Sequence, residues 1–198
     1  MVLEMLKDHD RYYARGLLDP DEALVGSSID GIPVLGTDEF LPELKQMGVR
    51  HFFVGVGRIG VADIREPLYN KALAMGFVPV TLIHASATVS VSAQMGEGVT
   101  IMAGVAVSAN ARIGANVLLN TRAVVEHDCQ VDDHVHIATG ACLTGTVRIG
   151  RSAHIGAGAV ILQNLKVGRH AVVGAGAVVT RDIPEGAVVA GCPARRMK

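Results

Sequence analysis

The sequence predicts a mainly β protein, a parallel β-helix of hexapeptide repeats preceded by a small α/β domain. An aliphatic residue recurs at every sixth position from Ile83 to Val179, and a second small or aliphatic residue follows each of them four positions later. Neither a helix with about 3.6 residues per turn nor an alternating strand keeps this phase for so long. A six-residue period is typical of a prism of short parallel strands whose two apolar positions per repeat fill a narrow core.

Three hexapeptides are expected to complete one coil of the prism. Residues 18 positions apart then stack on the same edge, roughly one strand spacing (~4.8 Å) apart. Glycine, asparagine, aspartate and serine at other positions turn the corners. The inward aliphatic positions are Ile83, Val89, Met95, Ile101, Val107, Ile113, Leu119, Val125, Val131, Ile137, Leu143, Ile149, Ile155, Ile161, Val167, Val173 and Val179.

The composition suits a thin core and limits the range of partners. Of the 198 residues 49% are hydrophobic, but only 4% are aromatic and tryptophan is absent. A net charge of −1 gives no general affinity for nucleic acid or for an anionic membrane. We therefore expect neither nucleic acid nor a membrane as a partner.

The chain carries the features of a cytoplasmic protein. No apolar run approaches the ~20 residues of a membrane span, and the opening MVLEMLKDHD lacks the layout of a signal peptide. Three cysteines are present, Cys129 at an inward position and Cys142 and Cys192 elsewhere. An odd count without paired spacing favours packing residues in a reducing compartment over a catalytic thiol.

The first 82 residues alternate between helix and strand patterns, which predicts parallel βαβ units. Ligands of such units bind at the carboxyl ends of the strands, where Asp19, Gly55 and Gly57 stand. Asp19 would accept hydrogen bonds from a base or ribose, and the two glycines would let the backbone approach a ligand. The alternative is a turn aspartate and ordinary loop glycines. The expected elements are helices at 1–8, 38–48 and 64–76 and strands at 12–19, 50–57 and 77–83.

The recorded start falls inside a helix, whereas a domain of this type begins with a strand and a glycine-bearing loop. We expect an apparently truncated domain. Its parallel sheet should have a gap or an exposed edge at the place of that strand.

Four stretches spread over most of the chain carry a family resemblance: 16–36, 51–65, 119–145 and 173–198, of which 119–145 is the most specific. They resemble left-handed β-helix acyltransferases of the sialic acid O-acetyltransferase family, and within it bacterial N-acetyltransferases acting on nucleotide-linked 4-amino-4,6-dideoxy sugars. The resemblance implies a left-handed β-helix at 83–198 that uses acetyl-CoA, and a Rossmann-like domain at 1–82 that holds a nucleotide-linked amino sugar. It also implies a homotrimer with acetyl-CoA between subunits.

The resemblance assigns catalytic roles residue by residue. His127 matches the general base of the family, and the acid that follows it, Asp128, matches its partner. His136 matches a second histidine near the acetyl carbonyl. Asn120 matches an asparagine of the acceptor pocket.

Further residues match the binding of the donor and of the nucleotide. Gly145 and the run Gly174, Ala175 and Gly176 match points where pantetheine passes. Asp19 matches the first of two acids near the nucleotide, but Pro20 replaces the second. At the C-terminus Arg195, Arg196 and Lys198 place positive charge where it could meet the CoA phosphates, the alternative being a solvated tail.

These groups suit acyl transfer from a thioester, which needs no metal. The acceptor must lose a proton as it attacks, and histidine is the side chain best suited to accept it at neutral pH. A neighbouring carboxylate fixes the tautomer of the base and stabilises the imidazolium. A second imidazole or main-chain amides can stabilise the oxyanion.

Three other functions remain open from the residues. O-acetylation of a sugar or of sialic acid needs the same base. His136 with His154, and His134 with His170, repeat at coil spacing, as in a zinc-dependent enzyme of the γ-carbonic-anhydrase type, but the His-x4-His pair of that group is missing. A non-enzymatic scaffold would show repeated outward residues, and the outward positions vary here.

The spacing of the two candidate histidines predicts a shared site. His127 and His136 are nine residues apart, half of one coil, so they should lie on different sides of one prism. If both serve one reaction, the groove must pair His127 of one subunit with His136 of its neighbour.

Overall fold

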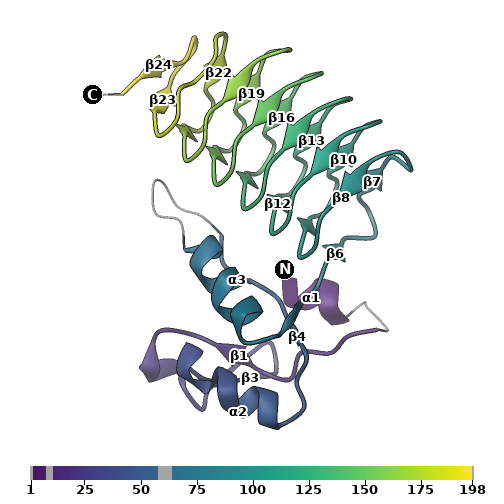
Figure 1. Cartoon of the computed structure of the whole chain (residues 1–198), viewed down its shortest axis with the longest axis vertical. Helices are drawn as coiled ribbons and strands as arrows, with labels where there is room; N and C mark the ends of the chain where they lie inside the picture. The colour runs from purple at the N-terminus through teal and green to yellow at the C-terminus, as the bar shows by residue number, and fades with distance from the viewer. Residues whose placement is uncertain (1, 8–10, 58–63, 198) are drawn as a thin grey trace.

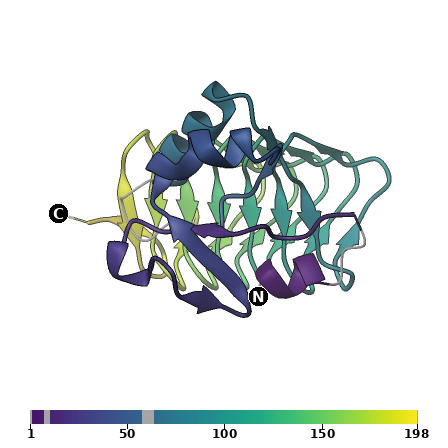
Figure 2. The ribbon, with the colours of Figure 1, turned by 90° about the horizontal axis from the view of Figure 1, so that it is seen from below.

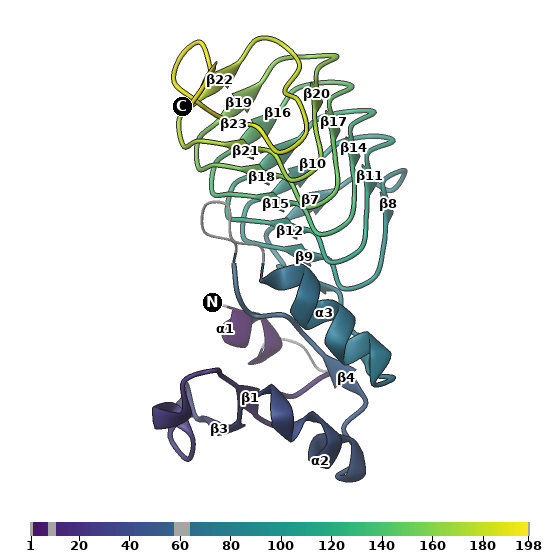
Figure 3. The same ribbon diagram turned by 60° about the vertical axis from the view of Figure 1, so that its left-hand side comes forward.

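The structure is a computed structural model, and it describes residues 2–7, 11–57 and 64–197. From Leu82 onward the chain winds into a left-handed parallel β-helix, a three-sided prism of stacked coils (Figures 1 and 3). Strands one coil apart pair in parallel, and Ala106 stands opposite Val124. The expected 18-residue coil is therefore confirmed.

Each side of the prism is a parallel sheet of short strands, named here after its first strand. The β6 face contains β6 (Leu82–Ile83), β9 (Thr100–Ile101), β12 (Leu118–Leu119), β15 (His136–Ile137), β18 (His154–Ile155), β21 (Val172–Val173), β23 (Val188–Ala190) and the antiparallel β24 (Arg195–Arg196). The β7 face contains β7 (Thr88–Val89), β10 (Ala106–Val107), β13 (Val124–Val125), β16 (Cys142–Leu143), β19 (Val160–Ile161) and β22 (Val178–Val179). The β8 face contains β8 (Gln94–Met95), β11 (Arg112–Ile113), β14 (Gln130–Val131), β17 (Arg148–Ile149) and β20 (Lys166–Val167).

Three edges join these faces. In each coil the chain crosses the first edge from the β6 to the β7 face, the second edge to the β8 face, and the third edge back to the β6 face. Left-handed residues recur at the edges, as Asp128 (φ 58°) on the second edge and His134 (φ 61°) on the third. A left-handed conformation costs most non-glycine residues roughly 1–2 kcal/mol. Glycine and asparagine therefore predominate at these positions.

The inward aliphatic series fills the core except in the first coil. Ile101, Ile137 and Ile155 are fully buried, whereas Ile83 and Met95 are 40% and 37% exposed. The prediction that the whole series points into a closed core is wrong for these two residues. They belong to the first strands of their sheets, and no earlier coil covers them.

The elements before Leu82 include the three expected helices. They are α1 (Val2–Lys7), β1 (Leu17–Leu18), η1 (Glu22–Leu24), β2 (Ser28–Ile29), β3 (Ile32–Gly36), η2 (Asp38–Phe40), α2 (Leu41–Gln46), β4 (His51–Phe52), α3 (Arg65–Ala74) and β5 (Val78–Pro79). The strands are shorter than expected. β2 and β3 form an antiparallel hairpin that the helix–strand alternation does not predict. Asp30 and Gly31 turn this hairpin with φ values of 50° and 81°.

The strands of this part form two separate groups. β1, β3 and β2 make one sheet, and β4 and β5 make a parallel pair joined through α3. The β4–α3–β5 segment is therefore one of the expected βαβ units. Among the described residues no strand links the two groups.

The N-terminal elements lie alongside the prism rather than on its axis (Figures 1 and 2). The start of α3 contacts the third edge, where Arg65 bonds Asn116. Outward residues of the β6 face such as Thr100 and Leu118 are buried, unlike those of the β8 face. None of the described helices has both the length and the apolar character needed to cross a membrane.

Candidate active site

His127 lies on the second edge, between β13 and β14, and pairs with the residue that follows it. Its Nδ1 is 2.8 Å from Asp128 Oδ2, and the two side chains are 59% and 50% exposed. A carboxylate at Nδ1 keeps the proton on that nitrogen and leaves the lone pair on Nε2. Such an arrangement can accept a proton at Nε2.

Asp128 is held in its ionised form. Hydrogen bonds from His127 and from Asn110, whose Nδ2 is 3.2 Å from Oδ1, lower the pKa of the Asp128 carboxyl below its usual value. The carboxylate is therefore charged at neutral pH and can stabilise an imidazolium beside it.

Gly145 lies one coil beyond His127, directly against the imidazole. A Cβ at Gly145 would stand 2.7 Å from Nε2 of His127 and 2.8 Å from its Cε1. Val91, Ala109 and Gln163 occupy the same position in other coils, so this edge accepts side chains there. Gly145 also lacks the positive φ that would require glycine. The imidazole of His127 is therefore the reason for a glycine at 145.

Cys129 is a packing residue beside this pair. Its Sγ donates to the carbonyl oxygen of Thr144 at 3.1 Å. Burial raises the pKa of the thiol to about 11. The thiol is thus protonated at neutral pH and is a poor nucleophile.

His136 lies on the β6 face and is only 5% exposed. A Cβ at Gly57 would lie 3.6 Å from its Cε1. On the neighbouring strand the ring of His154 stands edge-on, with the ring centroids 4.9 Å apart. The structure therefore brings together Gly57 and His136, two residues that the sequence assigned to different ligands.

The first edge, which borders the β6 face, holds Asn120 and the run Gly174–Gly176. Asn120 Oδ1 accepts a hydrogen bond from the amide of Thr121 at 2.8 Å. At coil spacing the edge then continues through Ala138, Gly156 and Gly174. These residues form a line of small side chains along the prism.

The remaining candidates for donor binding lie at the C-terminal end of the β6 face. Arg195 and Arg196 form β24 and are both exposed. Gly174 is close to this end, since a Cβ there would lie 3.0 Å from Cβ of Ala190. Lys198 lies outside the described residues.

Asp19 and Gly55 follow β1 and β4, as expected, but these strands belong to different sheets. Asp19 Oδ1 accepts a hydrogen bond from the amide of Asp21 at 2.9 Å, which is the contact of a turn aspartate. A Cβ at Gly55 would meet nothing within 4 Å, so the space beside this backbone is open.

The candidate residues thus form two groups in one chain. His127, Asp128 and Gly145 lie on the second edge, and the group around His136 lies on the β6 face and the first edge. The β7 face separates the two groups. Apart from the exposed Thr88, its outward residues are apolar and half-buried: Ala106, Val124, Cys142, Val160 and Val178.

Sequence reasoning missed a polar cluster that fastens α3 to the third edge. Glu66 Oε1 accepts from Nη2 and Nε of Arg151 at 2.6 and 3.2 Å, and its Oε2 accepts from Ser152 Oγ at 2.6 Å. Arg151 also donates to Asp133 Oδ2 at 3.1 Å. Burial raises the pKa of Glu66, but the hydrogen bonds from Ser152 and Arg151 outweigh it and hold the pKa below its usual value.

The same cluster continues to the buried Arg65 at the start of α3. Its Nη2 donates to Asn116 Oδ1 at 2.9 Å, and Asn116 Nδ2 lies 2.9 Å from His134 Nδ1. Asn116, His134 and Ser152 repeat at coil spacing, so the period alone aligns them on one edge. The sequence contains no signal that α3 docks there.

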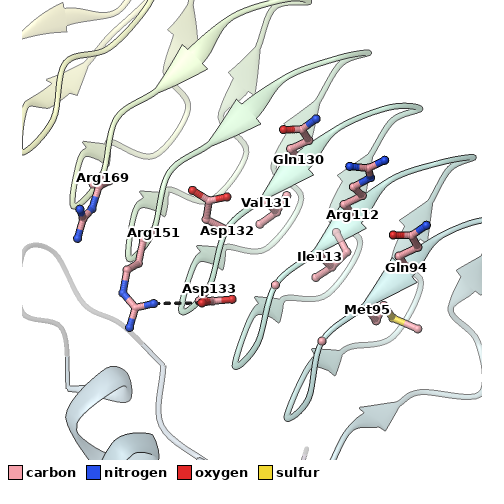
Figure 4. A pocket seen from close by; sticks show the side chains of 12 residues that line it. Gln94, Met95, Arg112, Ile113, Gln130, Val131, Asp132, Asp133, Arg151 and Arg169 are labelled. Atoms are coloured by element: carbon pink, nitrogen blue, oxygen red, sulfur yellow. Dashed lines mark hydrogen bonds and ion pairs between the residues drawn. The ribbon is translucent and has the colours of Figure 1, made fainter.

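A hollow of about 830 Å³ lies on the β8 face (Figure 4). Gln94, Arg112 and Gln130 project from neighbouring strands, and Arg151 points toward Asp133. A second hollow of about 290 Å³ reaches Asp128. None of the predicted site residues lines the larger hollow, and neither a histidine nor a cysteine does.

No metal centre is present among residues 2–7, 11–57 and 64–197. In these ranges no three histidine, cysteine, aspartate or glutamate side chains group so that they could hold a metal ion.

Known proteins resemble this chain over its full length. A family model described as bacterial transferase hexapeptide (six repeats) matches residues 110–145 and 146–181. A histidine-to-asparagine mutant of perosamine N-acetyltransferase from Caulobacter crescentus, solved with CoA and GDP-perosamine, is 37% identical with a TM-score of 0.92, covering 100% of this chain and 90% of that chain. The acetyltransferase domain of PglB from Neisseria gonorrhoeae FA1090, in complex with acetyl coenzyme A, is 39% identical with a TM-score of 0.87, covering 99% and 92%. WeeI from Acinetobacter baumannii AYE is 28% identical with a TM-score of 0.88, covering 99% and 93%. No curated protein sequence matches the chain.

The chain belongs to the hexapeptide-repeat transferase family. It is an acyltransferase, and the similarity to bacterial amino-sugar N-acetyltransferases indicated by the sequence is confirmed.

Proposed function

We propose that the chain transfers the acetyl group of acetyl-CoA to the amino group of a nucleotide-linked amino sugar, with His127 as general base. The observation that carries the proposal is the His127–Asp128 pair, which presents Nε2 on an exposed edge beside Gly145. Full-length similarity to N-acetyltransferases solved with GDP-perosamine, CoA or acetyl-CoA supports the substrates.

The reaction needs one base and one good leaving group. The sugar amine attacks the thioester carbonyl, a C–N bond forms, and Nε2 of His127 takes the proton from nitrogen. Asp128 stabilises the imidazolium from Nδ1. The tetrahedral intermediate then expels CoA as its thiolate, the C–S bond breaks, and the proton passes from His127 to sulfur. No metal takes part.

The two groups of residues suggest where each substrate binds. The line of small residues from Asn120 to Gly176 leaves room for pantetheine along the first edge, and Arg195 and Arg196 supply charge for the CoA phosphates. The part at 1–82, with Asp19, Gly55 and Gly57, holds the sugar nucleotide, and the prism at 83–198 holds the donor.

The separation of the two groups favours a homotrimer. The apolar outward residues of the β7 face are suited to contact between subunits. Packing about a threefold axis would set the second edge of one subunit against the β6 face of the next. We place this trimer in the cytoplasm, where acetyl-CoA is available.

A thiol-release assay with acetyl-CoA across a panel of sugar acceptors tests the proposal. GDP-perosamine and other nucleotide-linked amino sugars should release CoA, whereas hydroxyl analogues that lack the amine should not. The His127→Ala variant should lose about 10²–10⁴ in kcat with acetyl-CoA affinity nearly unchanged. His170→Asn, at an exposed histidine of the third edge, is the matched control and should keep full activity. If CoA is released only with the hydroxyl analogues, the reaction is O-acetylation and not N-acetylation. If the turnover of His127→Ala equals that of the wild type, His127 is not the general base.

A further inference from the structure

We infer that Arg65 is a positioning residue, whose guanidinium holds the glycine-bearing segment 54–57 against His136. The inference rests on the proposed function, in which this segment meets the sugar nucleotide and His136 lies near the acetyl group. It assigns a role to a residue that touches neither substrate.

The guanidinium of Arg65 joins this segment to the prism. Its Nη1 donates to the carbonyl oxygens of Val54 and Val56 at 3.1 and 2.5 Å. Its Nη2 donates to Asn116 on the third edge, at 2.9 Å to Oδ1 and 3.3 Å to the carbonyl oxygen. Arg65 is only 1% exposed. One buried side chain thus fixes two carbonyls of the segment relative to the β-helix.

The held carbonyls lie directly next to the contact with His136. Val56 precedes Gly57, and Gly57 is the residue whose Cβ position lies 3.6 Å from Cε1 of His136. Residues 53–57 form neither helix nor strand, so no regular backbone ladder fixes their place. A shift of the segment would therefore move the nucleotide-binding backbone and the surroundings of His136 together.

The attachment of α3 to the prism has a second set of bonds besides those of Arg65. Glu66 and Arg151 already join α3 to the third edge, and their bonds to Ser152 and Asp133 do not involve residues 54–57. Burying a guanidinium carries a large desolvation penalty. An apolar side chain would pack the start of α3 without that cost. What an arginine adds is a set of donors that bonds Val54 and Val56 on one side and Asn116 on the other.

Three variants separate positioning from attachment: Arg65→Met, Arg65→Lys and, as matched control, Arg151→Met. Each is measured in the acetyl-transfer assay, in thermal unfolding and by amide hydrogen exchange of residues 54–57. We expect Arg65→Met to raise KM for the sugar nucleotide about 10- to 100-fold, the range for the loss of a charge-assisted hydrogen bond. Exchange at 54–57 should become faster, while KM for acetyl-CoA changes little. Arg65→Lys should recover part of the loss, because an ammonium can still bond one carbonyl.

Arg151→Met should lower the unfolding temperature but leave both KM and the exchange at 54–57 near the wild-type values. Equal effects of Arg65→Met and Arg151→Met on KM and on exchange would overturn the inference, since Arg65 would then serve attachment alone. If the wild-type protein acetylates no sugar nucleotide, the proposed function fails. Hydrogen exchange still decides the positioning role in that case, because faster exchange at 54–57 confined to the Arg65 variants supports it and unchanged exchange refutes it.

Discussion

At the scale of single residues, the position of the His127 imidazole depends on the missing side chain at Gly145. Gly145→Ala would place a Cβ 2.7 Å from Nε2, so the ring must move. Since displacement of a catalytic group by about 1 Å can cost roughly 10²-fold in rate, we expect kcat to fall about 10- to 100-fold. The unfolding temperature should stay unchanged, because Val91, Ala109 and Gln163 are accommodated at the same position.

Steady-state kinetics and thermal unfolding check this prediction together. The control is Gln163→Ala, one coil further along the same edge, which should keep the wild-type kcat. A Gly145→Ala enzyme with normal kcat would show that the ring does not need this position for catalysis.

The sequence predicts some contacts of the candidate residues but not others. The His127–Asp128 pair is adjacent in the chain, and the 18-residue period already stacks Gly145 on His127, so both contacts follow from counting. The contact of Gly57 with His136 does not, because it depends on how the segment after β4 lies over the β6 face. For the same reason nothing in the sequence indicates that Arg65 donates hydrogen bonds to the carbonyl oxygens of Val54 and Val56.

At the scale of elements, α3 is attached to the third edge by a pH-sensitive ion pair. The folded protein holds the pKa of Glu66 below its ordinary value of 4.5, so the charged form is favoured by folding. Its contribution to stability is complete above pH 4.5 and is lost as the pH falls through the lower folded pKa. Arg151, Ser152 and His134 face this carboxylate.

Comparison of the wild type with Glu66→Gln at several pH values tests this attachment. At pH 7 we expect the variant to unfold about 3–6 °C lower, from a loss of roughly 1.5–2 kcal/mol in charge-assisted hydrogen bonds. The difference should shrink below pH 4.5. Thermal unfolding followed by circular dichroism gives the unfolding temperature of each protein at each pH. A difference between the two proteins that grows as the pH falls would contradict the lowered pKa of Glu66.

The elements of the prism were predictable because its period repeats across many coils. The two exceptions, Ile83 and Met95, arise at the start of the series, where the period is present but no preceding coil covers the residues. In the N-terminal part the hairpin at 28–36 carried a local signal, the Asp30–Gly31 turn, which the helix–strand alternation hides. The lengths of the short strands there depend on which strands they pair with, and the sequence pattern does not show this pairing.

At the scale of the whole molecule, the two groups of candidate residues lie on opposite sides of the β7 face. A single chain therefore presents His127 on one edge and His136 under the segment after β4. Assembly about a threefold axis would bring the two groups together in each of three grooves. The activity would then belong to the interface rather than to the fold of one subunit.

Complementation between inactive variants tests a shared site. Mixtures of His127→Ala and His136→Ala subunits, dissociated and reassembled, would contain interfaces with both native histidines. With random assembly of equal amounts, about a quarter of the grooves would be native, so roughly that fraction of the wild-type activity should return. Subunit exchange is followed by mass spectrometry of differently tagged chains, and a mixture of two His127→Ala preparations is the control. If the mixture stays inactive although the subunits have exchanged, the site is not shared, and its residues all belong to one chain.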